Sequence, residues 1–121
     1  MTKSPIENVK ALTFDIFGTV LDLAGSLIPP LDNLLKECGN KDNLKGADVW
    51  AQWRLRQRIE QYQDNLFMLG HSGYLAVKRR ALIYSLKNLK VEFTYKQIDE
   101  FMEAYQYLSP FPDAIEGLYR L

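Results

Sequence analysis

The 121-residue chain lacks what disulfide-stabilised, membrane-spanning and nucleic-acid-binding proteins require. Its single cysteine, Cys38, cannot form an internal disulfide, which is typical of the reducing cytoplasm. Its single histidine, His71, excludes a histidine-rich metal site and is expected in a solvated loop. No apolar run approaches the roughly 20 residues of a membrane span, and the first residues lack the apolar core of a secretory signal. Fifteen basic and fifteen acidic residues cancel, so no nucleic-acid partner is expected.

The chain does have the apolar content of a folded domain. Apolar residues make up 47% of it, including six Phe, seven Tyr and two Trp. At this length it forms one domain or part of one. The composition therefore allows a hydrophobic core but does not by itself indicate a function.

The most informative stretch is an apolar run that ends on a carboxylate. Four of residues 9–14 are apolar, which predicts a short buried strand. The strand would end at Asp15, where open α/β sheets place ligand-binding groups. Gly18 allows a sharp turn after it, and Thr19 offers a hydroxyl and an N–H group to an anion. This pattern fits a nucleophile at a strand tip, and it fits equally an aspartate that only caps a turn.

The rest of the chain is predicted to be helical. In chain order, helices are expected to open at Pro29, to cover residues 48–69 and 74–89, to follow a capping box at residues 94–97, and to begin again near Ala114. The helix over residues 74–89 has apolar residues on two sides, which predicts that it packs between two neighbours. A single parallel strand has no ladder partner and cannot be stable alone. We therefore expect the N-terminal half of a larger α/β protein.

The helix over residues 48–69 has two different faces. Its apolar residues recur every three or four positions and form one stripe: Ala51, Leu55, Ile59, Tyr62, Leu66 and Leu69. At about 100° per residue, the opposite face carries tryptophans and polar groups: Trp50, Trp53, Arg54, Gln57 and Gln61. We expect the apolar stripe to pack within the helical part and the tryptophan face to line a cleft.

The sequence of residues 10–22, KALTFDIFGTVLD, resembles the first motif of the haloacid dehalogenase superfamily. Further stretches that resemble L-2-haloacid dehalogenases follow in the right order, at residues 53–57, 62, 68–70, 81–86 and 108–113. The resemblance thus covers nearly the whole chain. It implies a Rossmann-like α/β core with a helical-bundle cap inserted after the first strand. The expected division is residues 1–24 for the strand and nucleophile loop, 25–109 for the cap, and 110–121 for the return to the core.

Position 17 separates two branches of this superfamily. Its phosphatases carry a second aspartate there, as general acid for the leaving oxygen, whereas this chain has Phe17. A halide leaving group needs no proton, so Phe17 favours the dehalogenase branch. The alternatives are a phosphate-ester hydrolase of the same superfamily and a non-catalytic fragment or helical interaction module.

The resemblance implies covalent catalysis on an L-2-haloacid substrate. Asp15 would attack the carbon that bears the halogen, and water would then hydrolyse the ester to a 2-hydroxy acid. Thr19 would orient Asp15 or contact the substrate carboxylate. Phe17, Gly18 and Tyr74 would line the substrate site, although Tyr74 would serve equally as a core aromatic. No cofactor or metal is assigned.

In this family an arginine on the first cap helix helps to take the halide. The Trp-Arg dipeptide points to Arg54, whereas an ungapped match through Tyr62 points to Arg56. Helix geometry favours Arg54, because Arg54 shares its face with both tryptophans and with Gln57, a further candidate for substrate binding. The alternative is that Arg54 only stacks on a tryptophan as a surface cation–π pair.

Two expectations concern completeness and assembly. The later motifs of the family would lie beyond Leu121, so the 121-residue chain alone is expected to be incomplete and inactive. The amphipathic helices would support a homodimer, although packing within the cap explains them as well.

Overall fold

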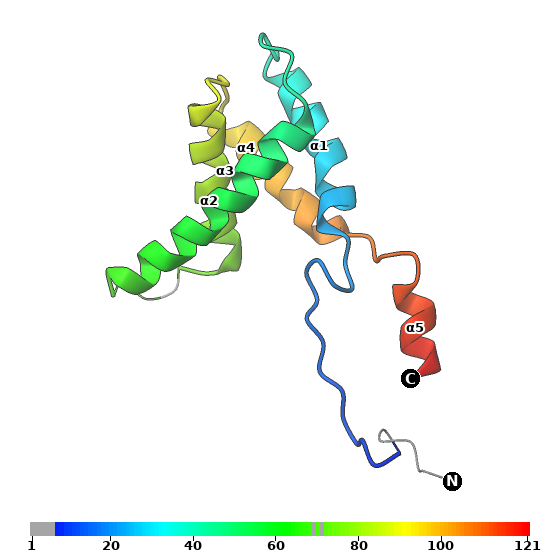
Figure 1. The fold of residues 1–121 in the computed structure, drawn as a ribbon. Coiled ribbons are helices and arrows are strands. Elements are labelled where there is room, and N and C mark those ends of the chain that lie inside the picture. Colours follow the sequence, from blue (N-terminus) through cyan, green and yellow to red (C-terminus); the bar gives the residue numbers. More distant parts are fainter. Residues whose placement is uncertain (1–6, 69, 71) are drawn as a thin grey trace.

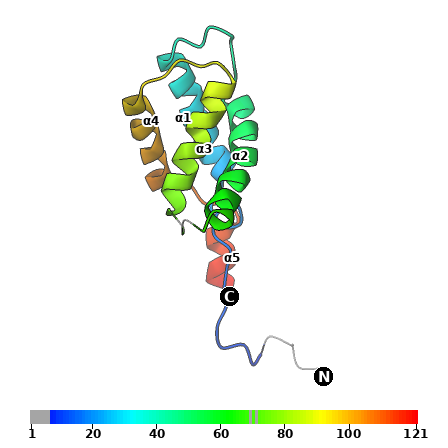
Figure 2. The same ribbon diagram turned by 90° about the vertical axis from the view of Figure 1, so that its left-hand side faces the viewer.

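The computed structural model describes residues 7–68, 70 and 72–121, which fold mainly as helices. The helices are α1 (Leu23–Glu37), α2 (Gly46–Leu66), α3 (Tyr74–Asn88), α4 (Tyr95–Met102), the 3₁₀ turn η1 (Glu103–Tyr107) and α5 (Ala114–Arg120). Helices α1 to α4 form a four-helix bundle in which each packs against two others (Figure 2). We call these four helices and η1 the bundle. None of the described helices is both long and apolar enough to cross a membrane.

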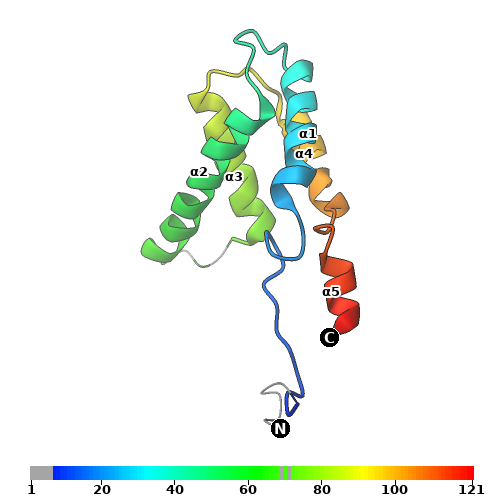
Figure 3. The same cartoon turned by 45° about the vertical axis from the view of Figure 1, so that its right-hand side comes forward.

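The segment before the bundle is extended but forms no strand. Within the described part of the chain, the only bridges of strand type are isolated ones, between Phe17 and Leu21 and between Leu21 and Pro110. Residues 7–16 run away from the bundle on the same side as α5 (Figures 1 and 3). Leu121, at the end of α5, lies near residues 9–12, but no described segment pairs with residues 9–14 as a strand. The predicted strand over residues 9–14 is therefore not observed, because an extended backbone gains its ladder hydrogen bonds only from a neighbouring strand. Apolar side chains of this segment are exposed, namely Val9, Leu12, Phe14 and Ile16.

Helix α1 begins at Leu23, so the prediction that it opens at Pro29 was wrong. Asp22 caps it, since its Oδ1 accepts a hydrogen bond from the Gly25 N–H at 2.9 Å. Capping supplies a partner to an otherwise unpaired backbone donor. The helix continues past Pro29 and Pro30, which lie inside it. It is stabilised by a row of leucines that pack in the core: Leu23, Leu27, Leu31, Leu34 and Leu35.

Helix α2 buries the face opposite to its apolar stripe. The side chain of Trp53 is 0% exposed, whereas that of Leu55 is 67% exposed. The other described members of the stripe are also exposed: Ala51, Ile59, Tyr62 and Leu66. The expectation that the stripe packs within the helical part was therefore wrong. Trp53 offers a larger area to bury than any residue of the stripe, and its indole N–H donates to the Lys78 carbonyl at 2.8 Å.

The last three predicted helices are observed close to where the sequence places them. Helix α3 packs between α2 and α4, as its two apolar sides predict. The capping box before α4 is formed, because Thr94 Oγ1 accepts from the Gln97 N–H at 3.2 Å and Gln97 Oε1 accepts from the Thr94 N–H at 2.9 Å. Helix α5 begins at Ala114 as expected. Leu69 and His71, which the sequence analysis placed in the stripe and in a loop, lie outside the described residues.

The orientation of α2 gives a first prediction. We expect Trp53→Ala to lower the free energy of unfolding by about 3–5 kcal/mol, because it opens a cavity in the core. Leu55→Ala on the same helix should change that free energy by less than about 0.5 kcal/mol, because its side chain is exposed. Urea unfolding followed by helical circular dichroism measures both. A larger loss for Leu55→Ala than for Trp53→Ala would mean that α2 is turned the other way.

Candidate active site

The loop around Asp15 is a tight turn that holds the carboxylate by a side-chain hydrogen bond. Thr19 Oγ1 donates to Asp15 Oδ2 at 2.9 Å. The turn closes through the N–H groups of Val20 and Leu21, which both donate to the Ile16 carbonyl, at 2.9 and 3.0 Å. Gly18 adopts a φ of +84°, which glycine tolerates without strain. The pattern leaves Asp15 exposed, with the Oδ1 oxygen free of hydrogen bonds to the described residues.

Backbone hydrogen bonds join this loop to the segment that follows η1. The Asp22 N–H donates to the Ser109 carbonyl at 2.8 Å, and the Phe111 N–H donates to the Val20 carbonyl at 2.9 Å. The segment that enters the bundle at residues 20–22 and the segment that leaves it at residues 109–111 therefore lie side by side. This pairing fixes where the Asp15 loop leaves the bundle.

Phe17 connects the Asp15 loop to one surface of the bundle. We call this surface the wall, and it comprises Arg54, Gln57, Tyr74, Lys78 and Tyr105. Its ring stacks on that of Tyr74 at the start of α3, with centroids 4.9 Å apart and planes at 13°. Tyr74 in turn meets Tyr105 of η1 edge to face at 6.1 Å, and Tyr105 meets Trp53 in the same way at 6.1 Å. An aromatic series thus leads from the loop into the core.

Two cations share one acceptor beside these aromatics. Gln57 Oε1 accepts hydrogen bonds from Lys78 Nζ at 2.7 Å and from Arg54 Nη1 at 3.2 Å. Lys78 Nζ also lies 4.5 Å from the centroid of the Tyr74 ring, and the Arg54 guanidinium lies 5.5 Å from that of Trp50. The stacking of Arg54 on a tryptophan is therefore present together with its hydrogen bond to Gln57. The Gln57 side chain is 2% exposed, and its Nε2 is buried without a partner among the described residues.

The electrostatics of this wall are unusual for a protein interior. Among the described residues, neither Arg54 nor Lys78 forms an ion pair with a carboxylate. Burial, and then repulsion by Arg54, lowers the pKa of Lys78 to about 8. Burial raises the pKa of both Tyr74 and Tyr105 above the ordinary tyrosine value. The wall consequently presents positive charge and neutral phenols, an arrangement suited to an anion.

Arg56 lies in a different environment. Its guanidinium pairs with Glu60 at 2.8 Å and covers the ring of Tyr84 at 3.7 Å. Glu60 also pairs with Arg80, whose guanidinium binds Asp64 as well. The structure therefore separates the two candidate arginines, with Arg54 at the aromatic wall and Arg56 in an ion-pair network.

Sequence reasoning missed Lys78 and did not connect Tyr105 with the site. A signal for Lys78 does exist, because it stands four residues after Tyr74 and so shares its helix face. Lys78 is a charged residue on the same side of the helix as the apolar residues Val77 and Ala81, and both of these are buried. Tyr105 is half-buried.

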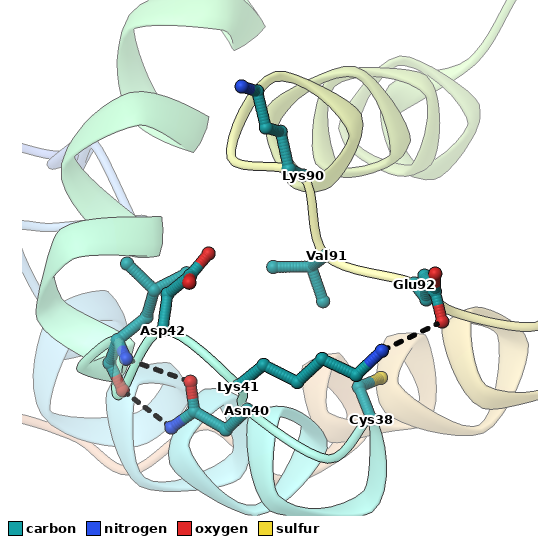
Figure 4. Close-up of a pocket in the computed structure, with 8 residues that line it drawn as sticks. Cys38, Asn40, Lys41, Asp42, Lys90, Val91 and Glu92 are labelled. Carbon is teal, nitrogen blue, oxygen red and sulfur yellow. Dashed lines mark hydrogen bonds and ion pairs between the residues drawn. The ribbon is translucent and has the colours of Figure 1, made fainter.

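Two alternatives to this wall are a metal centre and a cavity elsewhere in the bundle. Within the described ranges, no three Asp, Glu, Cys or His side chains are grouped closely enough to hold a metal ion. A cavity of about 50 Å³ is lined by Cys38, Asn40 and residues of the loop after α3. Its walls are held by the Lys41–Glu92 ion pair and by hydrogen bonds between Asn40 and Leu44 (Figure 4). It lies at the far end of the bundle from the Asp15 loop (Figure 1).

Comparison with known proteins points to one family of enzymes. No protein-family model matches the chain. It is 28% identical over 119 residues to (S)-2-haloacid dehalogenase 4A of Burkholderia cepacia, covering 96% of this chain and 46% of that protein. It is 27% identical over 113 residues to (S)-2-haloacid dehalogenase of Xanthobacter autotrophicus, covering 93% and 41%.

Solved structures agree with these relatives. The L-2-haloacid dehalogenase of Xanthobacter autotrophicus superposes with a TM-score of 0.70 at 25% identity, over 88% of this chain and 40% of that one. The same enzyme with chloropropionic acid covalently bound gives a TM-score of 0.61 at 25% identity, over 82% and 37%. This chain therefore spans less than half the length of the relatives that it matches. Over that part, the resemblance to L-2-haloacid dehalogenases predicted from the sequence is confirmed in both sequence and fold.

Proposed function

We propose that this chain carries the nucleophile and the halide-binding wall of a hydrolase that removes halide from L-2-haloacids. One observation carries the proposal. The exposed Asp15, held by Thr19, stands on a loop whose Phe17 stacks on Tyr74, directly beside two cations that have no described carboxylate partner. Such a site offers a nucleophile on one side and a place for an anion on the other.

The chemistry requires two displacements at different atoms. A carboxylate oxygen of Asp15 attacks C2 of the haloacid, and a C–O bond forms while the carbon–halogen bond breaks. The halide leaves with the bonding electron pair, opposite the attacking oxygen. Water then attacks the ester, restores the Asp15 carboxylate and releases a 2-hydroxy acid of inverted configuration. The chloropropionic acid bound covalently in the solved relative supports an intermediate of this kind.

Phe17 distinguishes this reaction from phosphate-ester hydrolysis. An alcohol leaving oxygen needs a proton, and Phe17 has none to give. Its ring is instead engaged in the stack on Tyr74, where it forms an apolar wall next to Asp15. A halide needs no proton, so an aromatic at this position suits dehalogenation.

We further propose the division of the chain that the sequence predicts, with residues 1–24 and 110–121 in an α/β core and 25–109 as a helical cap. The exposed apolar residues outside the bundle support it, because Leu12, Phe14, Ile115 and Leu118 have no covering layer among the described residues. On this division the site lies between cap and core. The 121-residue chain would hold only the nucleophile and the cap side.

The assignment of the nucleophile gives a second prediction. In the whole protein that contains this chain, Asp15→Asn should abolish halide release while the unfolding midpoint stays within a few degrees of the unchanged protein. Asp42→Asn is the matched control, since Asp42 is exposed at the far end of the bundle. The 121-residue chain by itself should also release no halide. Substantial turnover by Asp15→Asn would show that another residue is the nucleophile.

The two arginines give a third prediction. Arg54→Lys keeps the charge but loses the planar fork of donors, so kcat/KM for a 2-haloacid should fall at least about tenfold, a loss of roughly 1.4 kcal/mol of transition-state stabilisation. Arg56→Lys should stay within about threefold, because Arg56 is engaged with Glu60 and Tyr84. Steady-state kinetics of the two variants decide between them. The reverse ranking would assign the halide to Arg56.

A further inference from the structure

Besides Arg54, the proposed halide-binding arginine, the wall carries a second positive charge, on Lys78. Lys78 is 5% exposed, and its Nζ reaches the same Gln57 oxygen as Arg54 does. Two like charges are thereby held close together around a single neutral acceptor. Burying a charge without a counter-charge is costly, so an anion that joins this arrangement would stabilise its charged form.

Unsatisfied donors point to the same place. An ammonium has three N–H donors, and Lys78 uses one on Gln57 within the described part of the chain. Gln57 Nε2 is buried and has no partner there. The guanidinium of Arg54 has donors left after its bond to Gln57 and is on an exposed side chain, which gives an ion a way in. Arg54, Lys78 and Gln57 thus have donors left over after Gln57 Oε1, the one acceptor among their side chains, has been used.

The groups that face Lys78 differ in how they respond to pH. Arg54 on α2 is a guanidinium cation, and Gln57 on the same helix has no titratable group. Tyr74 on α3 and Tyr105 on η1 have raised pKa values, so both stay neutral at pH 7 to 9.5. Phe17 of the Asp15 loop is apolar. The pKa of Lys78 is lowered to about 8, so Lys78 is the member of this wall whose charge changes in that range.

We infer that Lys78 is a specificity-determining residue of the leaving-group site: with Arg54 and the Gln57 amide it binds the released halide ion, and it does so only while its ammonium is protonated. The identity of the anion rests on the proposed function, whereas the anion site itself rests on the three donors. Halide retention should therefore weaken as the pH rises through the pKa of Lys78.

Chloride inhibition of the whole protein tests this inference. Between pH 7 and 9.5, at constant ionic strength set with sodium gluconate, the inhibition constant for chloride should rise by about tenfold in the unchanged protein. Lys78→Met should bind chloride about tenfold more weakly at pH 7 and show no further change with pH. Lys78→Arg should restore tight binding without the pH dependence, since arginine does not deprotonate there. Lys87→Met, on the exposed side of α3, is the control and should behave like the unchanged protein.

Each contrary result has a definite meaning. Chloride inhibition that is independent of pH in the unchanged protein, or equal in Lys78→Met, would overturn the inference. A raised KM for the haloacid with unchanged chloride inhibition would assign Lys78 to the substrate carboxylate and also overturn it. If the protein releases no halide from any 2-haloacid, the proposed function fails, and chloride binding followed directly by the line width of ³⁵Cl nuclear magnetic resonance still decides the role of Lys78.

Stability against pH supplies a readout that does not need turnover. A lysine whose pKa is lowered on folding binds fewer protons in the folded than in the unfolded state between pH 8 and about 10.4. Stability therefore rises with pH across that window in the unchanged protein relative to Lys78→Met. Added chloride binds the charged form, so it should raise the unfolding midpoint of the unchanged protein at pH 7 more than at pH 9.5. An equal effect of chloride on Lys78→Met would contradict the site.

Discussion

The indole of Trp53 packs where three parts of the bundle meet. It is fully buried on α2, touches Phe101 of α4 edge to face at 5.6 Å and Tyr105 of η1 at 6.1 Å. Its N–H donates to the backbone carbonyl of Lys78 on α3 at 2.8 Å. A large apolar surface and a satisfied polar atom together specify one orientation of α2. That orientation places Gln57, one turn later, in the interior beside Lys78.

The same orientation buries polar groups that α2 would otherwise have exposed. Glu60 and Asp64 follow Gln57 at helical spacing and lie against α3, where Arg80 pairs with both. The hydroxyl of Ser72, together with Arg80, holds the pKa of Asp64 below its usual range. Because these charges are paired and hydrogen-bonded, the bundle tolerates their burial. Among the buried charged residues that the structure describes, Lys78 alone has no ion-pair partner, which distinguishes the site from the structural network further along α2.

The candidate site therefore combines two kinds of constraint. The hydrogen bonds of the turn hold Asp15 in place through backbone and side chain, and they are local in sequence. The wall beside it is assembled from α2, α3 and η1, which are distant in sequence and meet only through packing. The stack of Phe17 on Tyr74 is the contact that brings the two together. This contact places the Asp15 loop next to Tyr74, over which Lys78 lies, and the proposed function depends on that arrangement.

The sequence by itself determined the local features. The Asp15 turn, the capping box at Thr94, the approximate extents of α2 and α3 and the start of α5 follow from neighbouring residues and from helical periodicity. Tertiary structure decided which face of α2 is buried. Periodicity identifies two faces, but it does not say which neighbour offers the larger complementary surface or the hydrogen-bond acceptor, and here α3 and α4 offer both to Trp53. Lys78 entered the site for the same reason, since its environment depends on helices remote in the chain. The strand predicted over residues 9–14 is not formed for a related reason, because an extended segment needs a neighbouring strand to supply its hydrogen bonds.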